Sequence, residues 1–149
     1  MFSAGVMSLR KITGFTCGAF DLLHAGHALM LEECKEYCDE LVVGLQTDPS
    51  IDRPDKNKPV QSFQERLTML KSIKWVDAIV FYSTEAELYD LLEATMPDVR
   101  IVGADWKGKE YTGHELGMNV YFNSRGHSWS TRELRKRVYN AERSKDDFR

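Results

Sequence analysis

Two histidines three positions apart, His24 and His27, are the residues of this sequence best suited to do chemistry. They close the stretch Gly18–His27, which follows a short apolar run, Ile12–Cys17, typical of a buried strand. The apolar periodicity after them predicts a helix. A helix N-terminus offers free backbone N–H groups and a partial positive charge, so this junction favours a phosphate group. Gly26 lets the backbone come close, and both imidazoles could reach one phosphate.

A zinc site is the main alternative use of such a pair, since histidine is a common metal ligand. The cysteines do not support it. Cys34 and Cys38 lie four positions apart on the predicted helix, Cys17 lies in the strand, and none forms a CxxC pair or a familiar zinc spacing. We therefore expect no dedicated protein metal site. An incidental surface or core pair is the other alternative, and the strand–glycine–helix context argues against it.

Length and composition predict one domain over residues 1–149, with a loose lead-in at 1–10 and a charged, fraying tail at 142–149. A net charge of −3 gives no basic field, so we expect no nucleic-acid partner. No apolar run approaches the roughly 20 residues that cross a bilayer, and the N-terminus does not resemble a signal peptide. Three cysteines at core-like positions fit a reducing cytosol, so we expect a cytoplasmic protein without a membrane partner.

Apolar patterns predict strands that alternate with helices. The strands are expected at Lys11–Cys17, Glu40–Leu45, Ala78–Phe81, Arg100–Gly103 and Val120–Phe122. Helices are expected from His24 or Gly26 to Cys38, from Ser62, from Thr84 to before Pro97, at Tyr111–Leu116 and from about Ser130. Three of them begin with capping boxes, at Ser62–Glu65, Thr84–Glu87 and Ser130–Glu133. The loop Gln46–Gln61 is long for a compact domain and is therefore expected to be functional or mobile.

This alternation predicts an α/β fold, a Rossmann-like doubly wound sheet of five parallel strands in the order 3-2-1-4-5, with helices on both faces. The first and fourth strands are then neighbours. The loops that follow them, with the histidine pair in one and Gly103–Gly108 in the other, should face each other across one cleft.

Four segments resemble the signatures of a known superfamily in the same order along the chain. They are Gly18–His27, Trp75–Asp77, Gly103–Gly108 and Arg125–Thr131. The sequence from about Lys11 to Val138 resembles the HxGH nucleotidylyltransferase superfamily, within it the cytidylyltransferase family, and most closely the glycerol-3-phosphate cytidylyltransferase type. Gly126–Trp129 departs from the Thr-Glu-Gly-Ile of that family, which leaves the grip on the base open and the reaction type unaffected.

The resemblance implies transfer of CMP from CTP to a small phosphorylated acceptor, glycerol 3-phosphate, to give CDP-glycerol and pyrophosphate. It also implies Mg²⁺ bound with the nucleotide triphosphate, and a homodimer. A phosphate-monoester nucleophile is already ionised at neutral pH, so alignment and charge stabilisation are required rather than a general base. Two alternatives remain open: an ATP-using adenylyltransferase of the pantetheine-phosphate, heptose-phosphate or FMN type, and a non-catalytic nucleotide sensor.

The resemblance also implies roles for individual residues. The catalytic set is His24, His27, Lys56 and Arg125, with the histidines on the α- and β-phosphates and Arg125 gripping phosphate. Lys58 and Arg66 would bind the acceptor. The nucleotide would contact Gly18, Ala19, Phe20, Asp21, Gly26, Asp105, Trp106, His127, Ser128, Trp129, Ser130 and Thr131.

Several of these residues have an ordinary structural interpretation as well. Asp21 could be a turn residue, Arg66 a solvated arginine on a helix face, and Trp106 a core residue. Ser130 and Thr131 could simply cap the last helix, although one residue can cap a helix and bind phosphate at once.

Overall fold

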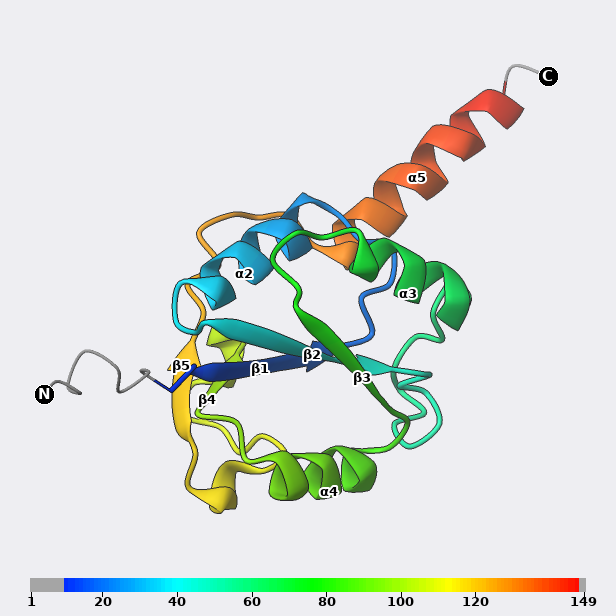
Figure 1. The fold of residues 1–149 in the computed structure, drawn as a ribbon. Coiled ribbons are helices and arrows are strands. Elements are labelled where there is room, and N and C mark those ends of the chain that lie inside the picture. Colours follow the sequence, from blue (N-terminus) through cyan, green and yellow to red (C-terminus); the bar gives the residue numbers. More distant parts are fainter. Residues whose placement is uncertain (1–9, 148–149) are drawn as a thin grey trace, which may run out of the picture.

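The computed structural model describes residues 10–147 and has a five-stranded parallel sheet at its centre (Figure 1). The strands are β1 (Thr13–Gly18), β2 (Glu40–Gln46), β3 (Ala78–Tyr82), β4 (Val99–Val102) and β5 (Asn119–Phe122). Their order is β3-β2-β1-β4-β5 and every neighbouring pair is parallel. The predicted fold class and strand order are confirmed. Residues 1–9 of the expected lead-in lie outside the described residues.

Helices cover both faces of the sheet. They are α2 (Ala25–Lys35), α3 (Phe63–Lys71), α4 (Glu85–Thr95) and α5 (Thr131–Asp146), with single 3₁₀ turns at Ala104–Trp106 and His114–Leu116. In Figure 1, α2 and α3 lie above the sheet and α4 below it. Among the residues described, none of these helices is both long and apolar enough to cross a bilayer.

Helix α2 ends at Lys35, three residues before the predicted end at Cys38. The chain turns early because Asp39, the residue before β2, already pairs with Ile12. Its carboxylate accepts the N–H of Ile12 at 2.7 Å, and its own N–H donates to the Ile12 carbonyl at 2.8 Å. The apolar residues that suggested a longer helix therefore belong to this turn.

The predicted N-termini of α3 and α4 are confirmed. The Ser62 hydroxyl accepts the N–H of Glu65 at 3.1 Å, while Glu65 accepts the N–H of Ser62 at 3.0 Å. Thr84 and Glu87 form the same reciprocal pair at the start of α4. These caps fix where each helix leaves the preceding loop.

The core has two halves because neighbouring residues of a strand point to opposite faces of the sheet. Leu41, Val43 and Leu45 of β2 pack with buried residues of α2 and α3. On the other face, Phe15 and Tyr82 pack with buried leucines of α4. Burial on both faces holds the carboxyl ends of the strands rigidly, and the loops of the site leave from these ends.

Helix α5 projects away from the sheet and its two layers (Figure 1). It has no buried residue, and every residue from Lys136 to Asp147 is exposed. The helix continues to Asp146, into the charged tail from Glu142, whose fraying stays a prediction. Residues 148–149 of the expected tail lie outside the described residues.

Candidate functional site

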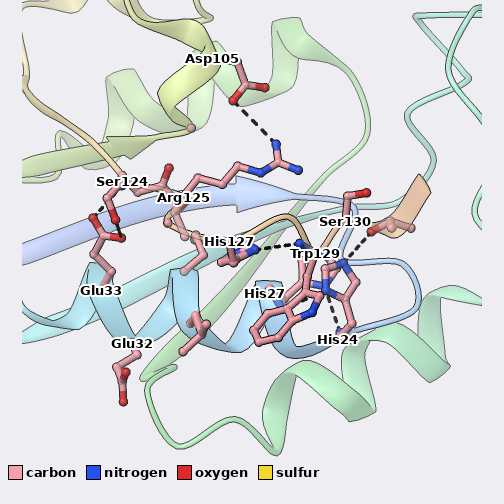
Figure 2. A pocket seen from close by; sticks show the side chains of 18 of the residues that line it. His24, His27, Glu32, Glu33, Asp105, Ser124, Arg125, His127, Trp129 and Ser130 are labelled. Atoms are coloured by element: carbon pink, nitrogen blue, oxygen red, sulfur yellow. Dashed lines mark hydrogen bonds and ion pairs between the residues drawn. The ribbon is translucent and has the colours of Figure 1, made fainter. Parts of the chain in front are cut away.

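A cleft of about 730 Å³ opens at the carboxyl ends of β1 and β4, along α2 (Figure 2). This is the edge at which open α/β sheets bind ligands. Ten of the predicted site residues line it: His24, Gly26, His27, Asp105, Trp106, Arg125, His127, Trp129, Ser130 and Thr131. Residues distant in sequence, from the loops after β1, β4 and β5, thus converge on one cleft.

The two histidines cap α2 as a reciprocal pair. His24 is the N-cap, and its Nδ1 accepts the N–H of Gly26 at 3.0 Å. In return, Nδ1 of His27 accepts the N–H of His24 at 3.1 Å. A neutral imidazole has one donor and one acceptor nitrogen, so these bonds assign the proton of each ring to Nε2. The Nε2 atom of His24 lies 3.1 Å from the hydroxyl oxygen of Thr131 at the start of α5.

Both rings are biased toward the neutral form. Burial lowers the pKa of His27 to about 4, and the neighbouring His24 lowers it further than Asp21 raises it. Burial also lowers the pKa of His24, and the nearby His127, Arg125 and Arg137 lower it by smaller amounts. His27 is therefore neutral at pH 7 and presents an N–H donor, the form suited to hydrogen-bond a phosphate oxygen.

Gly26 lies so close to the rings of His24 and His127 that a side chain at this position would displace them. A Cβ atom there would lie 2.8 Å from Cε1 of His24 and 2.9 Å from Cε1 of His127. Both contacts are shorter than side chains tolerate, and both are with rings of the site. The close approach of the α2 backbone to these rings therefore depends on glycine.

Arg125 connects two loops across the cleft. Its guanidinium lies 4.0 Å from a carboxylate oxygen of Asp105, in the loop after β4 (Figure 2). Its backbone is left-handed, with φ of 44°. A non-glycine residue in this region is strained, and such strain is common at functional sites.

Glu33 of α2 anchors the segment before Arg125. Its carboxylate accepts the N–H and the hydroxyl of Ser124, each at 2.9 Å, and the hydroxyl of Tyr121 at 3.0 Å (Figure 2). Sequence reasoning missed Glu33 and Ser124, and no motif or spacing marks them. Other lining residues that it missed are Thr16, Cys17, Leu29, Met30, Glu32, Glu36, Gly103, Tyr121, Asn123 and Gly126.

An aromatic pair forms part of the cleft wall. The rings of His127 and Trp129 stack with centroids 5.3 Å apart and an interplanar angle of 28°. The backbone N–H of Trp129 donates to Nδ1 of His127 at 3.1 Å, which fixes the turn between the two residues. Trp129 is 49% exposed and Leu29 of α2 is 44% exposed. This partly exposed apolar surface suits a planar ring such as a nucleobase.

Five residues predicted to contact nucleotide lie outside this cleft wall: Gly18, Ala19, Phe20, Asp21 and Ser128. Asp21 accepts the N–H groups of Val60 at 2.9 Å and Gln61 at 3.0 Å, so its carboxylate holds the end of the long loop. Phe20 is buried and its ring packs against His27. Ser128 is exposed in the loop before α5, beside lining residues, without being one.

A second cavity, of about 370 Å³, lies next to the first and shares four wall residues with it: Thr16, Cys17, Gly103 and Trp106. Gly18, Ala19 and Lys56 line this smaller cavity rather than the histidine cleft. Lys58 lines neither. The structure therefore places the predicted catalytic lysine on the far side of the shared wall.

Arg66 differs most from its expected role at the acceptor. It is 2% exposed, and its guanidinium donates to backbone carbonyls of Ala19 at 2.9 Å, Gln46 at 2.7 Å, Gln61 at 3.3 Å and also Thr47. A buried charge requires such partners, and these carbonyls take four of the five N–H donors of the guanidinium. Arg66 thus joins the ends of β1 and β2 to the long loop.

Comparisons with known proteins agree with this geometry. The cytidylyltransferase-like family model matches residues 15–139. The bifunctional protein HldE of Campylobacter curvus is 33% identical over 143 residues, covering 94% of this chain and 30% of that protein. HldE of Helicobacter pylori is 38% identical over 125 residues, covering 83% of this chain and 27% of that protein. The chain thus spans less than a third of the length of these relatives.

Solved structures give the same result. A lipopolysaccharide core biosynthesis protein from Thermoplasma volcanium superposes with a TM-score of 0.62 at 28% identity, covering 76% of this chain and 94% of that one. A pantothenate synthetase from Thermus thermophilus, at 14% identity and a TM-score of 0.53 over 79% of this chain and 56% of that one, shares the fold alone. With a family model that covers most of its length, this chain belongs to the cytidylyltransferase-like family of nucleotidyltransferases.

Proposed function

We propose that this protein transfers an adenylyl group from ATP to a phosphorylated sugar and releases pyrophosphate. One observation carries the proposal: two histidines hold their Nε2 donors at the N-terminus of α2, beside Thr131 at the N-terminus of α5. Two helix N-termini and two neutral imidazole donors in one cleft suit a triphosphate.

In the proposed reaction, a phosphate oxygen of the acceptor attacks the α-phosphorus of the nucleotide. A new P–O bond forms, the bond to the bridging oxygen breaks, and pyrophosphate leaves with the electron pair. Negative charge grows on the oxygens of the α-phosphate and on the leaving group. The Nε2–H groups of His24 and His27 stabilise this charge, while Arg125, Ser130 and Thr131 bind the outer phosphates.

Magnesium fits this site as a companion of the nucleotide. Within residues 10–147, no cluster of three or more histidine, cysteine or acidic side chains could hold a metal ion. Mg²⁺ prefers phosphate oxygens, water and one or two carboxylates, and Asp105 offers a carboxylate on the cleft wall. When bound, Mg²⁺ neutralises charge on the triphosphate.

The relatives support ATP and a sugar phosphate more than our first expectation of CTP and glycerol 3-phosphate. HldE proteins are adenylyltransferases of the heptose-phosphate type, one of the alternatives that the sequence left open. The structural relative from Thermoplasma volcanium is named for lipopolysaccharide core biosynthesis. The homodimer implied by the resemblance and the cytoplasmic location expected from the cysteine content stay predictions.

The test measures pyrophosphate release with Mg²⁺, comparing ATP with CTP and heptose 1-phosphate with mannose 1-phosphate and glycerol 3-phosphate. Release with ATP and a sugar phosphate would support the proposal. Release only with CTP and glycerol 3-phosphate would favour our first expectation. Nucleotide binding without release from any pair would favour a sensor.

Alanine variants of histidines inside and outside the cleft test whether the histidine pair is needed for the reaction. His24→Ala and His27→Ala should each lower kcat about 100- to 1000-fold, the usual effect of removing one charge-stabilising donor. His114→Ala is the control, because His114 is an exposed histidine bonded to Tyr111 and Glu115, outside both cavities. Its activity should stay within twofold of the wild type.

A further inference from the structure

The smaller cavity has an unusual wall. In the described part of the chain, three buried side-chain atoms have no hydrogen-bond partner: Nε of Arg53, Oε2 of Glu85 and Nε of Arg100. All three residues line this one cavity. Buried polar atoms are nearly always paired in folded proteins, so three orphans around one cavity indicate a site built for a polar molecule.

Arg100 is the most constrained of the three. It is 4% exposed although it lies in the middle of a sheet strand, β4. Its Nη1 donates to the Thr112 carbonyl at 2.7 Å, and its guanidinium lies over the rings of Phe15 and Tyr111 at 5.7 and 5.4 Å. Among the described residues, no carboxylate forms an ion pair with it. A buried guanidinium without a counter-ion favours an anionic or hydroxyl-rich ligand.

Glu85 supplies a negatively charged hydrogen-bond acceptor to the same cavity. It is the first residue of α4, and its Oε1 lies 3.3 Å from a guanidinium nitrogen of Arg53 and 3.4 Å from the Thr112 hydroxyl. Its other oxygen, Oε2, is buried and accepts no bond. A carboxylate oxygen accepts hydrogen bonds from hydroxyl groups, whereas it repels the negative charge of a phosphate. The wall therefore combines cations, which suit phosphate, with an acceptor that suits sugar hydroxyls.

The position of the cavity completes the assignment. It adjoins the histidine cleft, because Thr16, Cys17, Gly103 and Trp106 line both cavities. Lys56 of the long loop faces the same space from the loop side. A molecule in the smaller cavity is thus placed to meet a nucleotide held by the histidines.

We infer that the smaller cavity binds the acceptor of the proposed reaction and selects one with several hydroxyl groups, through Glu85, Arg53 and Arg100. The inference rests on the proposed function. Hydroxyls of the acceptor donate to Oε2 of Glu85, and Nε–H groups of Arg53 and Arg100 donate to its oxygens. A site built to hydrogen-bond hydroxyls rejects molecules that lack them, because its buried groups then stay unpaired. Glycerol 3-phosphate, with few hydroxyls, should therefore bind less well than a sugar phosphate.

The kinetic test uses Glu85→Gln, a change that keeps the shape of the side chain. Its kcat/KM for the preferred sugar 1-phosphate should fall about 10- to 100-fold, while the KM for ATP stays within twofold. With glycerol 3-phosphate the decrease should be smaller. Glu93→Gln is the matched control, since Glu93 is an exposed glutamate of the same helix outside the cavity. Arg53→Gln, at a partly exposed position, gives a second variant with the same expected pattern.

A binding test separates this inference from the proposed function. Saturation-transfer NMR measures binding of glucose 1-phosphate and mannose 1-phosphate to the wild type and to Glu85→Gln, without nucleotide. Binding that the substitution weakens would support the inference even if the wild type transferred no nucleotide. The inference would be overturned if the wild type bound neither sugar phosphate, or if Glu85→Gln changed neither binding nor acceptor preference.

Discussion

Replacing His27 with asparagine should remove a large part of the pH dependence of folding stability between pH 6.5 and 4. Burial holds the pKa of His27 at about 4 in the folded protein, against 6.5 for an unperturbed histidine. Between these values the unfolded chain binds a proton that the folded chain refuses. The contribution to stability is therefore complete above pH 6.5 and is lost as the pH falls toward 4.

The size of the effect follows from the shift. A difference of 6.5 − 4 corresponds to about 3.5 kcal/mol in the free energy of unfolding, at about 1.4 kcal/mol for each pKa unit. Most of it, about 2.5 kcal/mol, should already be lost at pH 4.5. Asparagine keeps a side-chain oxygen that can accept the N–H of His24, so the cap of α2 is disturbed little.

Urea denaturation, monitored by tryptophan fluorescence at pH 7.5, 6.5, 5.5 and 4.5, gives the free energy of unfolding of the wild type and of His27→Asn. The difference between the two proteins at each pH is the contribution of His27. Carboxylates titrate in both proteins and cancel in the comparison. His114→Asn makes the same change at an exposed histidine outside both cavities and serves as the control. If His27→Asn lost stability with falling pH as steeply as the wild type, the buried neutral state assigned to His27 would be refuted.

Three further substitutions test other parts of the structure. Gly26→Ala should lower kcat at least 10-fold with a small change in unfolding free energy, because its Cβ would push aside the rings of His24 and His127; wild-type kinetics would contradict this. Arg66→Met should destabilise the protein by about 3 kcal/mol or more in urea denaturation, since it leaves several carbonyls without donors, and an unchanged midpoint would refute the structural role. Trp129→Leu should weaken nucleotide affinity about 10-fold by calorimetry if the base stacks on this ring, whereas equal affinity would exclude such stacking.

The sequence carried enough information for the fold and for the histidine cleft. Alternation of strands and helices leaves few topologies, because parallel crossovers are right-handed, and the junction between the first strand and the first helix places the histidine pair at the carboxyl edge of the sheet. Local pattern could also locate Ser62 and Thr84 as caps, since a capping box involves only neighbouring residues.

Long-range convergence could not be predicted in the same way. Arg66 lies on a helix whose spacing does not reveal whether an arginine points to solvent, to a substrate or into the protein. Its buried position depends on carbonyls at the ends of two strands. Likewise Arg53, Glu85 and Arg100 come from a loop, a helix start and a strand, and only the folded chain brings them together. Side-chain direction in three dimensions is the missing information in each case.

Helix α5 amplifies any tilt of its first turn, because most of its length extends beyond the rest of the protein (Figure 1). Its first turn contributes Thr131 to the cleft, and the rest of the helix extends outward from there. The whole helix has 16 residues and is therefore about 24 Å long at 1.5 Å per residue. A tilt of about 10° at the first turn would therefore displace the far end by about 4 Å. A fluorophore placed at Lys145, near the far end, would report a small rearrangement around bound phosphate as a displacement of several ångströms.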